Sequence, residues 1–154
     1  MFGNSEINSE LFIEKLSEFG DVKVAQSTKN ILITKINDVK VDFVNYKYPL
    51  LSNSLHIENI RMLSTKDIAA MKLNAIAGRG SKKDFIDLYF ILNEFSLEEI
   101  VSFYENKYND GSVFMVQKSL THFEDADLQQ QPKMFLDFDW ETCKQKIIEE
   151  VLKL

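Results

Sequence analysis

Three charged residues stand where the helical pattern of the chain is otherwise apolar, and they are the residues best suited to chemistry. Lys72 lies near the centre of the apolar arc that a period of about 100° per residue predicts for a helix over Thr65–Ala77. Asp84 and Asp87 follow in the segment Lys82–Asn93 at a helical spacing, so they share one stripe. Because a buried charge is costly unless it is paired or used, these residues define the candidate site.

The role of Lys72 has three interpretations that the residue pattern leaves open. Its ammonium could reach solvent along an apolar stem, pair with Asp87, or act as a point charge on a phosphate. If Lys72 and Asp87 are both buried, loss of the lysine should lower stability by roughly 3 kcal/mol. Asp84 either accepts a capping bond from the backbone of Ser81 or supports the site. Asp87 is placed to orient Lys72 or Arg79, and Arg79 could bind phosphate or these acids themselves.

Positive charge is concentrated in one segment of an otherwise acidic chain, whose formal net charge is −6. Segment 94–154 holds 13 acids and 6 bases, whereas the acid within segment 61–83 is Asp67 alone. A basic segment in an acidic protein suits a ligand that carries phosphate, and a chance fluctuation of surface charge is the alternative. The bases of segment 61–83 are Arg61, Lys66, Lys72, Arg79, Lys82 and Lys83, and we assign phosphate binding to Lys72, Arg79, Lys82 and Lys83.

The elements that must position these residues follow from apolar periodicity and capping residues. Ser64 and Ser81 each precede an aspartate at the capping-box spacing and are predicted to begin the two central helices. Strands are predicted over Ile31–Ile36 and Val39–Asn45, joined by a tight turn at Asn37-Asp38. The far side of the helix Thr65–Ala77 is expected to carry Asp67, Ala70 and Asn74. Further strands are expected over Val22–Gln26 and Ile57–Met62. Further helices are expected from Asn8 or Ser9 to Phe19, from Ser96 to Tyr108, over Ser112–His122 and over Trp140–Leu154. A loop is expected over Glu124–Pro132.

Strands come first and helices later, which favours the α+β fold class. A length of 154 residues predicts a single domain, residues 1–154, with a sheet portion over about 1–62 and a helical portion over about 63–154. A hydrophobic content of 45% is enough for a packed core and excludes a disordered chain. The chain has no run of 18 apolar residues and no signal peptide, so we expect a soluble, cytoplasmic protein that does not bind membranes.

Several classes of site are excluded by the residues present. Cys143 is the one cysteine, so it forms no disulfide within the chain and no metal cluster. His56 and His122 lie far apart and have no zinc-type spacing. The sequence contains no phosphate-binding loop and no dinucleotide fingerprint. The aromatic residues Phe135, Phe138 and Trp140 are expected to be core anchors.

The segment DIAAMKLNAIAGRG, directly followed by SKKDFIDLYFIL (residues 67–92), resembles the nucleotidyltransferases of the AbiEii/AbiGii toxin family. The segments VKVDFVNYKYPLL (39–51) and KSLTHFEDADLQQQPKMF (118–135) also fit, so the resemblance covers essentially the whole chain. It implies a nucleotidyltransferase-like (polymerase-beta-like) fold with a small mixed sheet and a helical C-terminal half. It also implies transfer of a nucleotide from an NTP to an acceptor such as tRNA, with Mg²⁺ as cofactor.

The resemblance assigns catalytic roles to Asp42, Lys72 and Asp87, with Asp84 in support. Family members carry a metal-binding Asp-x-Asp strand near the start, and the opening residues Met1–Asn4 resemble those that follow such a strand. We therefore expect an N-terminally truncated and inactive chain with no bound Mg²⁺. Asp42 would be a metal ligand only if the missing pair were supplied.

Two functions remain open at this point. The first is a nucleotidyltransferase-type toxin of a type IV toxin–antitoxin or abortive-infection system. The second is a non-catalytic remnant or binding module that contacts a phosphate ligand or a protein partner such as a cognate antitoxin. Without the family's first strand, the hairpin Ile31–Asn45 should expose an edge, and we expect self-association or the docking of a partner strand there.

Overall fold

The computed structural model describes residues 2–3 and 5–154, whose contacts divide the chain into two compact units, Met1–Tyr48 and Pro49–Leu154. The boundary lies before the expected division near residue 62, since the contacts assign residues 49–62 to the helical unit. That the two units behave as a single domain stays a prediction.

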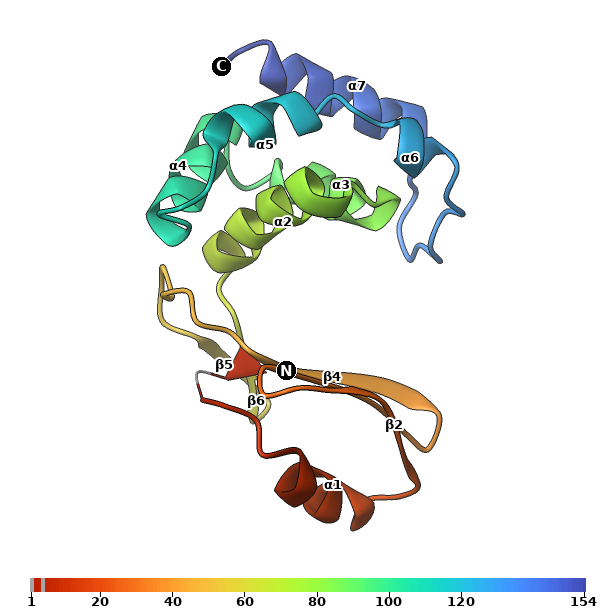
Figure 1. The fold of residues 1–154 in the computed structure, drawn as a ribbon. Coiled ribbons are helices and arrows are strands. Elements are labelled where there is room, and N and C mark those ends of the chain that lie inside the picture. Colours follow the sequence, from red (N-terminus) through yellow and green to blue (C-terminus); the bar gives the residue numbers. More distant parts are fainter. Residues whose placement is uncertain (1, 4) are drawn as a thin grey trace. The chain divides into compact units, whose positions relative to one another are not determined.

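The first unit is a four-stranded mixed sheet with one helix. The strand order is β1-β4-β3-β2, in which β1 is parallel to β4 and the other neighbours are antiparallel. The predicted bounds of the central hairpin are confirmed. The elements of this unit are β1 (Phe2–Gly3), α1 (Ser9–Ser17), β2 (Val22–Ser27), β3 (Ile31–Ile36) and β4 (Val39–Asn45), drawn in red to orange in Figure 1.

The predicted tight turn between β3 and β4 also organises the connection from α1 to β2. Asn37 and Asp38 both have positive φ, as a hairpin turn that follows the strand twist requires. The Asn37 side chain accepts a bond from the Asp21 amide (3.0 Å) and donates to the Phe19 carbonyl (3.3 Å). Gly20 lies under this amide at φ 154°, and a Cβ there would come within 2.2 Å of the Asn37 side chain. A glycine is therefore required at this position.

The exposed strand edge predicted along Ile31–Asn45 is shorter than expected. β3 is covered on both sides by β4 and β2. The outer side of β4 pairs with β1, with Phe2 opposite Val44 and Gly3 opposite Asn45. Within residues 2–3 and 5–154, no further strand pairs with the Val39–Phe43 part of that side. Self-association along this shorter stretch stays a prediction.

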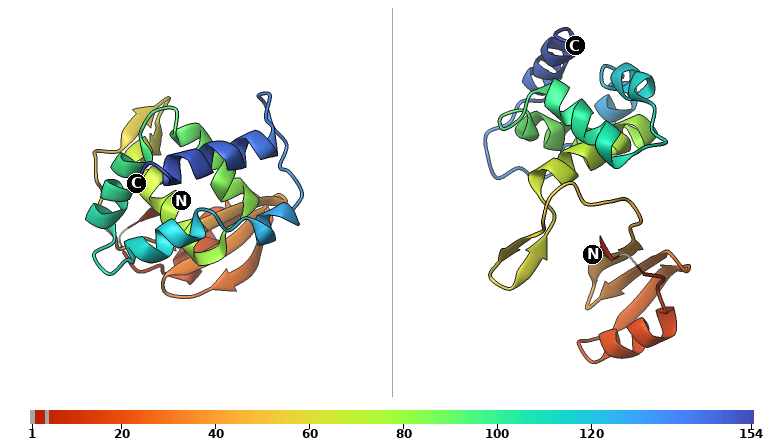
Figure 2. Two further views of the ribbon diagram at one scale, coloured as in Figure 1. Left: turned by 90° about the horizontal axis from the view of Figure 1, so that it is seen from above. Right: turned by 90° about the vertical axis from the view of Figure 1, so that its left-hand side faces the viewer.

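The second unit consists of six helices and a two-stranded hairpin among its described residues. Helix α2 is its centre, because α3, α4 and α5 all pack against it and α7 packs against α3 (Figures 1 and 2). The elements are β5 (Leu55–Ile57), β6 (Ile60–Met62), α2 (Thr65–Arg79), α3 (Lys82–Ile91), α4 (Leu97–Lys107), α5 (Val113–Ser119), α6 (Glu124–Asp127) and α7 (Trp140–Val151).

Two local predictions in this unit are wrong. The segment expected to form one strand over Ile57–Met62 contains a turn, because Glu58 and Asn59 adopt positive φ and reverse the chain into the β5–β6 hairpin. The segment expected to be a loop over Glu124–Pro132 begins with the short helix α6, which buries Ala126. No helix in the described part of the chain is long and apolar enough to cross a membrane.

Aromatic side chains fill much of the core of the helical unit. The buried Phe85 ring lies 4.9 Å from the Phe123 ring and 6.2 Å from the Trp140 ring, measured between centroids. Phe138 is partly buried and packs on Tyr89. The prediction of core anchors thus fits Trp140 and Phe138. It is wrong for Phe135, whose surface is 91% exposed because it lies in the loop between α6 and α7.

Candidate functional site

The helices α2 and α3 bring the predicted site residues together in the second unit. Helix α2 ends where Gly80 adopts a left-handed conformation (φ 52°), which glycine tolerates well. Helix α3 begins two residues later and returns against α2. Lys72 and Arg79, on α2, thereby face Asp84 and Asp87, on α3.

Asp84 makes the most hydrogen bonds of the residues in this cluster. Its side chain is fully buried, and it accepts four hydrogen bonds. Arg79 binds it in a bidentate manner, with Nε 2.8 Å from Oδ2 and Nη2 3.0 Å from Oδ1. The Lys72 ammonium lies 3.2 Å from Oδ1, and the Ser81 hydroxyl donates to Oδ2. The expected capping bond from the Ser81 backbone is replaced by this bond from the hydroxyl.

The ionisation of Asp84 follows from these contacts. Burial alone would raise the pKa of this carboxyl, because it disfavours the charged form. The hydrogen bonds from Arg79 and Ser81 and the charge of Lys72 outweigh burial and lower the pKa from 3.8 to about 2. The same pairing raises the pKa of Arg79. Asp84 is therefore a carboxylate at every physiological pH.

Lys72 bridges two carboxylates that differ in exposure. Its ammonium contacts Asp84, which is fully buried, and Asp87, whose side chain is 48% exposed. The lysine side chain itself is 23% exposed. The ion pair between Lys72 and Asp87, one of the interpretations that the sequence left open, is thus present. Asp84 is a second partner of Lys72 that the sequence did not predict.

Lys72 lies at the margin of the buried face of α2, and the prediction of a central place is wrong. The buried face includes Asp67 and Ala70, which were expected on the far side, whereas Ile68 is exposed. The buried face of α2 is rotated from its predicted position because the Asp67 carboxylate has enough hydrogen-bond and ion-pair partners to be buried, as described below. Lys72 is consequently left where the α2–α3 contact meets solvent.

The other predicted phosphate-binding residues have different surroundings. The Arg79 side chain is 61% exposed although two of its nitrogens bind Asp84. The Lys82 ammonium is buried, donates to the Gln129 carbonyl (2.7 Å) and lies 5.0 Å from the centre of the Trp140 ring. Lys83 is exposed. Of the four predicted phosphate-binding cations, a ligand can therefore approach Lys72, Arg79 and Lys83.

A second cluster of charges was not indicated by the residue pattern. Asp67 and Lys107 form an ion pair of 2.6 Å in which both side chains are fully buried. Asp67 also accepts from the Leu51 amide (2.9 Å), and Lys107 donates to the Pro49 carbonyl (2.7 Å). The spacing of Ser64 and Asp67 predicted only a cap. The partner lies 40 residues further along the chain, and no local signal marks it.

Asp42 belongs to the other unit, on β4. It lies on the strand face opposite Phe43, as predicted from alternation, and its carboxylate is 3.2 Å from the Lys40 ammonium. The described residues contain no group of three or more His, Cys, Asp or Glu side chains that could hold a metal. The described residues therefore offer no set of three or more such ligands for the magnesium that the resemblance implies.

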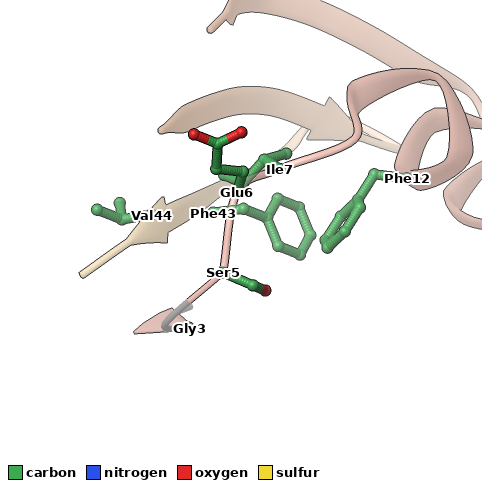
Figure 3. A pocket seen from close by; sticks show the side chains of 7 residues that line it. All are labelled: Gly3, Ser5, Glu6, Ile7, Phe12, Phe43 and Val44. Carbon is green, nitrogen blue, oxygen red and sulfur yellow. The ribbon is translucent and has the colours of Figure 1, made fainter. Parts of the chain in front are cut away.

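A small cavity in the sheet unit does not suit a nucleotide either. It measures about 110 Å³, and the rings of Phe12 and Phe43 meet in a T-shaped, edge-on contact at one side of it (Figure 3). Ligand pockets usually enclose several hundred Å³. The residues that line it are Gly3, Ser5, Glu6, Ile7, Phe12, Phe43 and Val44.

We expect Lys72→Ala to lower the free energy of unfolding by about 1 kcal/mol, rather than the 3 kcal/mol of a fully buried pair. Asp84 keeps Arg79 and Ser81, and Asp87 is half exposed, so neither carboxylate is left buried without a partner. Urea unfolding followed by fluorescence measures the change, because Trp140 is the one tryptophan and lies in the helical unit. Asn74→Ala, at an exposed position of α2, is the control, and a loss of 3 kcal/mol or more would contradict the expectation.

Comparisons with known proteins agree with the fold. A family model described as "Nucleotidyl transferase AbiEii toxin, Type IV TA system" matches residues 12–153. The uncharacterized protein aq_aa25 of Aquifex aeolicus (strain VF5) is 39% identical over an alignment of 118 residues, and the match covers 74% of this chain and 56% of that protein. The chain thus spans little more than half the length of this curated relative.

Two solved structures have the same fold. One is described as a "putative nucleotidyltransferase from H. pylori", with a TM-score of 0.58 at 14% identity over 99% of this chain and 74% of that one. The other is JHP933 from Helicobacter pylori, with a TM-score of 0.57 at 15% identity over 99% and 72% of the two chains. The predicted nucleotidyltransferase-like architecture is confirmed.

Proposed function

The chain belongs to the AbiEii nucleotidyltransferase toxin family, and from this premise we propose that it takes part in transferring a nucleotide from an NTP to an acceptor. We assign the Lys72 ammonium to the triphosphate of the NTP. One observation carries the assignment: the ammonium is held by the buried Asp84, yet 23% of the lysine side chain stays open to solvent. A charge fixed in this way needs little further ordering when a phosphate binds.

Arg79 and Lys83 extend this positive surface. Arg79 directs Nε and Nη2 at Asp84, so its position is fixed although most of the side chain is exposed. Lys83 is exposed in the first turn of α3. Lys82 contributes less in this proposal, since its ammonium holds the Gln129 carbonyl. Asp87 and Asp84 position Lys72.

The acceptor and the protein partner are proposed on the family alone. The family is that of toxins from type IV toxin–antitoxin systems. We propose an RNA acceptor such as tRNA, an antitoxin encoded with the toxin, a role in abortive infection, and action in the cytoplasm. Homo-oligomerisation through the Val39–Phe43 edge of β4 is a separate proposal, which rests on the part of that edge with which no described strand pairs.

We further propose that this polypeptide of 154 residues does not transfer a nucleotide by itself. Its described residues provide no ligand set for the Mg²⁺ that the family implies. The polypeptide, labelled NTPs, Mg²⁺ and total tRNA should therefore give no labelled product. Metal-dependent labelling that disappears in Asp42→Ala would overturn this proposal and assign Asp42 a direct role.

The absence of a group of three or more metal ligands among the described residues also favours the second function, a binding module that retains the phosphate-recognising cations. The two functions are separated by measuring NTP binding and nucleotide transfer on the same preparation. Binding without transfer supports the module. Transfer supports the enzyme, and the absence of both removes the phosphate role of Lys72.

A further inference from the structure

The two carboxylates that share Lys72 differ in how firmly they are held. Asp84 is fully buried and accepts four hydrogen bonds from Lys72, Arg79 and Ser81. Asp87 is 48% exposed, and within residues 2–3 and 5–154 Lys72 is its one ion-pair partner. The inner carboxylate is thus part of the packed structure, and the outer one is a contact at the surface.

We propose that Asp87 is a displaceable internal anion, which occupies the outer side of the Lys72 ammonium until a phosphate group of the nucleotide takes its place. The inference rests on the proposed function, because it assumes that Lys72 receives a phosphate. It assigns to Asp87 a role as a positioning residue that limits access to the lysine.

Burial decides which of the two carboxylates gives way. Moving Asp84 would leave a buried charge and the Arg79 guanidinium without partners, which is strongly unfavourable. Moving Asp87 exchanges one half-exposed ion pair for hydration, and exposed ion pairs contribute little to stability. Asp84 therefore continues to hold Lys72 while Asp87 swings out.

The surroundings of Asp87 provide a place for the freed carboxylate. Lys83 is exposed and precedes Asp87 by one helical turn on α3, a spacing at which side chains are neighbours. A triphosphate carries more negative charge than a single carboxylate and can contact Lys72 and Arg79 together. Displacement should therefore favour triphosphate over a singly charged anion.

The test is the binding of inorganic triphosphate to the full 154-residue chain by calorimetry at low salt. Asp87→Asn removes the competing charge and keeps the side-chain shape, so we expect it to tighten binding about fivefold. Asp87→Glu keeps the competing charge and should bind like the wild type. Asp110→Asn, which removes an exposed carboxylate in the turn before α5, controls for the change in net charge and should change affinity less than twofold.

Each result has one interpretation. Tighter binding by Asp87→Asn that is lost in the double variant Lys72→Ala/Asp87→Asn supports the displacement. Equal binding by the wild type and Asp87→Asn overturns it but leaves the phosphate site in place. No binding by either protein refutes the phosphate role of Lys72 and the displacement with it. If Asp87→Asn does not give the wild-type circular dichroism spectrum, Asp87→Ser is measured in its place.

Discussion

Lys107→Met should destabilise the helical unit by about 3–5 kcal/mol, the cost of removing one partner from a buried ion pair. Both side chains of the Lys107–Asp67 pair are fully buried at an N–O distance of 2.6 Å. Methionine has a similar length and fills the space, so the expected loss reports the carboxylate left without its cation and not a cavity. Urea unfolding followed by Trp140 fluorescence measures it.

The control for this prediction is Lys118→Met, on the exposed side of α5, which should change stability by less than 0.5 kcal/mol. A similarly small loss for Lys107→Met would contradict the assignment of a buried pair. Asp67→Asn in the Lys107→Met background should recover part of the loss. Recovery stays incomplete, because Asp67 also accepts from the Leu51 amide and the Ser64 hydroxyl.

The pair also fixes the start of the helical unit. Burial alone would raise the pKa of Asp67, but hydrogen bonds from Lys107, Ser64 and the Leu51 amide lower it, so the carboxylate stays charged. Lys107, on α4, also donates to the Pro49 carbonyl. The segment after Tyr48 is therefore held by α2 and α4 together, and Lys107→Met should speed hydrogen exchange at the Leu51 amide.

The features that the sequence could predict are those that residues close together in the chain determine. The hairpin β3–β4 was predicted to the residue because alternation and the Asn37-Asp38 turn lie within one short segment. The starts of α2 and α3 were predicted for the same reason, since Ser64 caps α2 within one turn and Ser81 begins α3, although the Ser81 side chain accepts no capping bond and donates to Asp84 instead. Caps and turns are local, so their signals survive without knowledge of the packing.

What the sequence could not predict depends on partners far along the chain. The polar face of α2 was placed on the wrong side because Asp67 is buried by Lys107 and by the loop from Pro49. The pair between Lys72 and Asp87 could be predicted, since the break between α2 and α3 is short. The larger role of Asp84 could not, because it looked like an ordinary cap until its burial was known.

Asp84→Asn should lower the free energy of unfolding by about 2 kcal/mol at neutral pH, which is the free energy that a pKa lowered from 3.8 to about 2 represents. The variant replaces an anion by a neutral amide opposite the Arg79 guanidinium and the Lys72 ammonium. Asp125→Asn, on the exposed surface of α6, is the matched control and should change stability by less than 0.5 kcal/mol.

The pH dependence of that difference identifies its cause. Because folding lowers the pKa of Asp84, its charge stabilises the fold fully above pH 3.8, and the stabilisation is lost as the pH falls through about 2. The difference in the free energy of unfolding between the wild type and Asp84→Asn should therefore be constant from neutral pH down to about pH 4. This gap should then narrow in more acidic buffers. Urea unfolding at several pH values between 7 and 2.5 measures this gap. A gap of constant size over the whole range would mean that the amide disturbs packing and hydrogen bonding around Ser81, and that the charge of Asp84 does not hold the Lys72 and Arg79 cations in place.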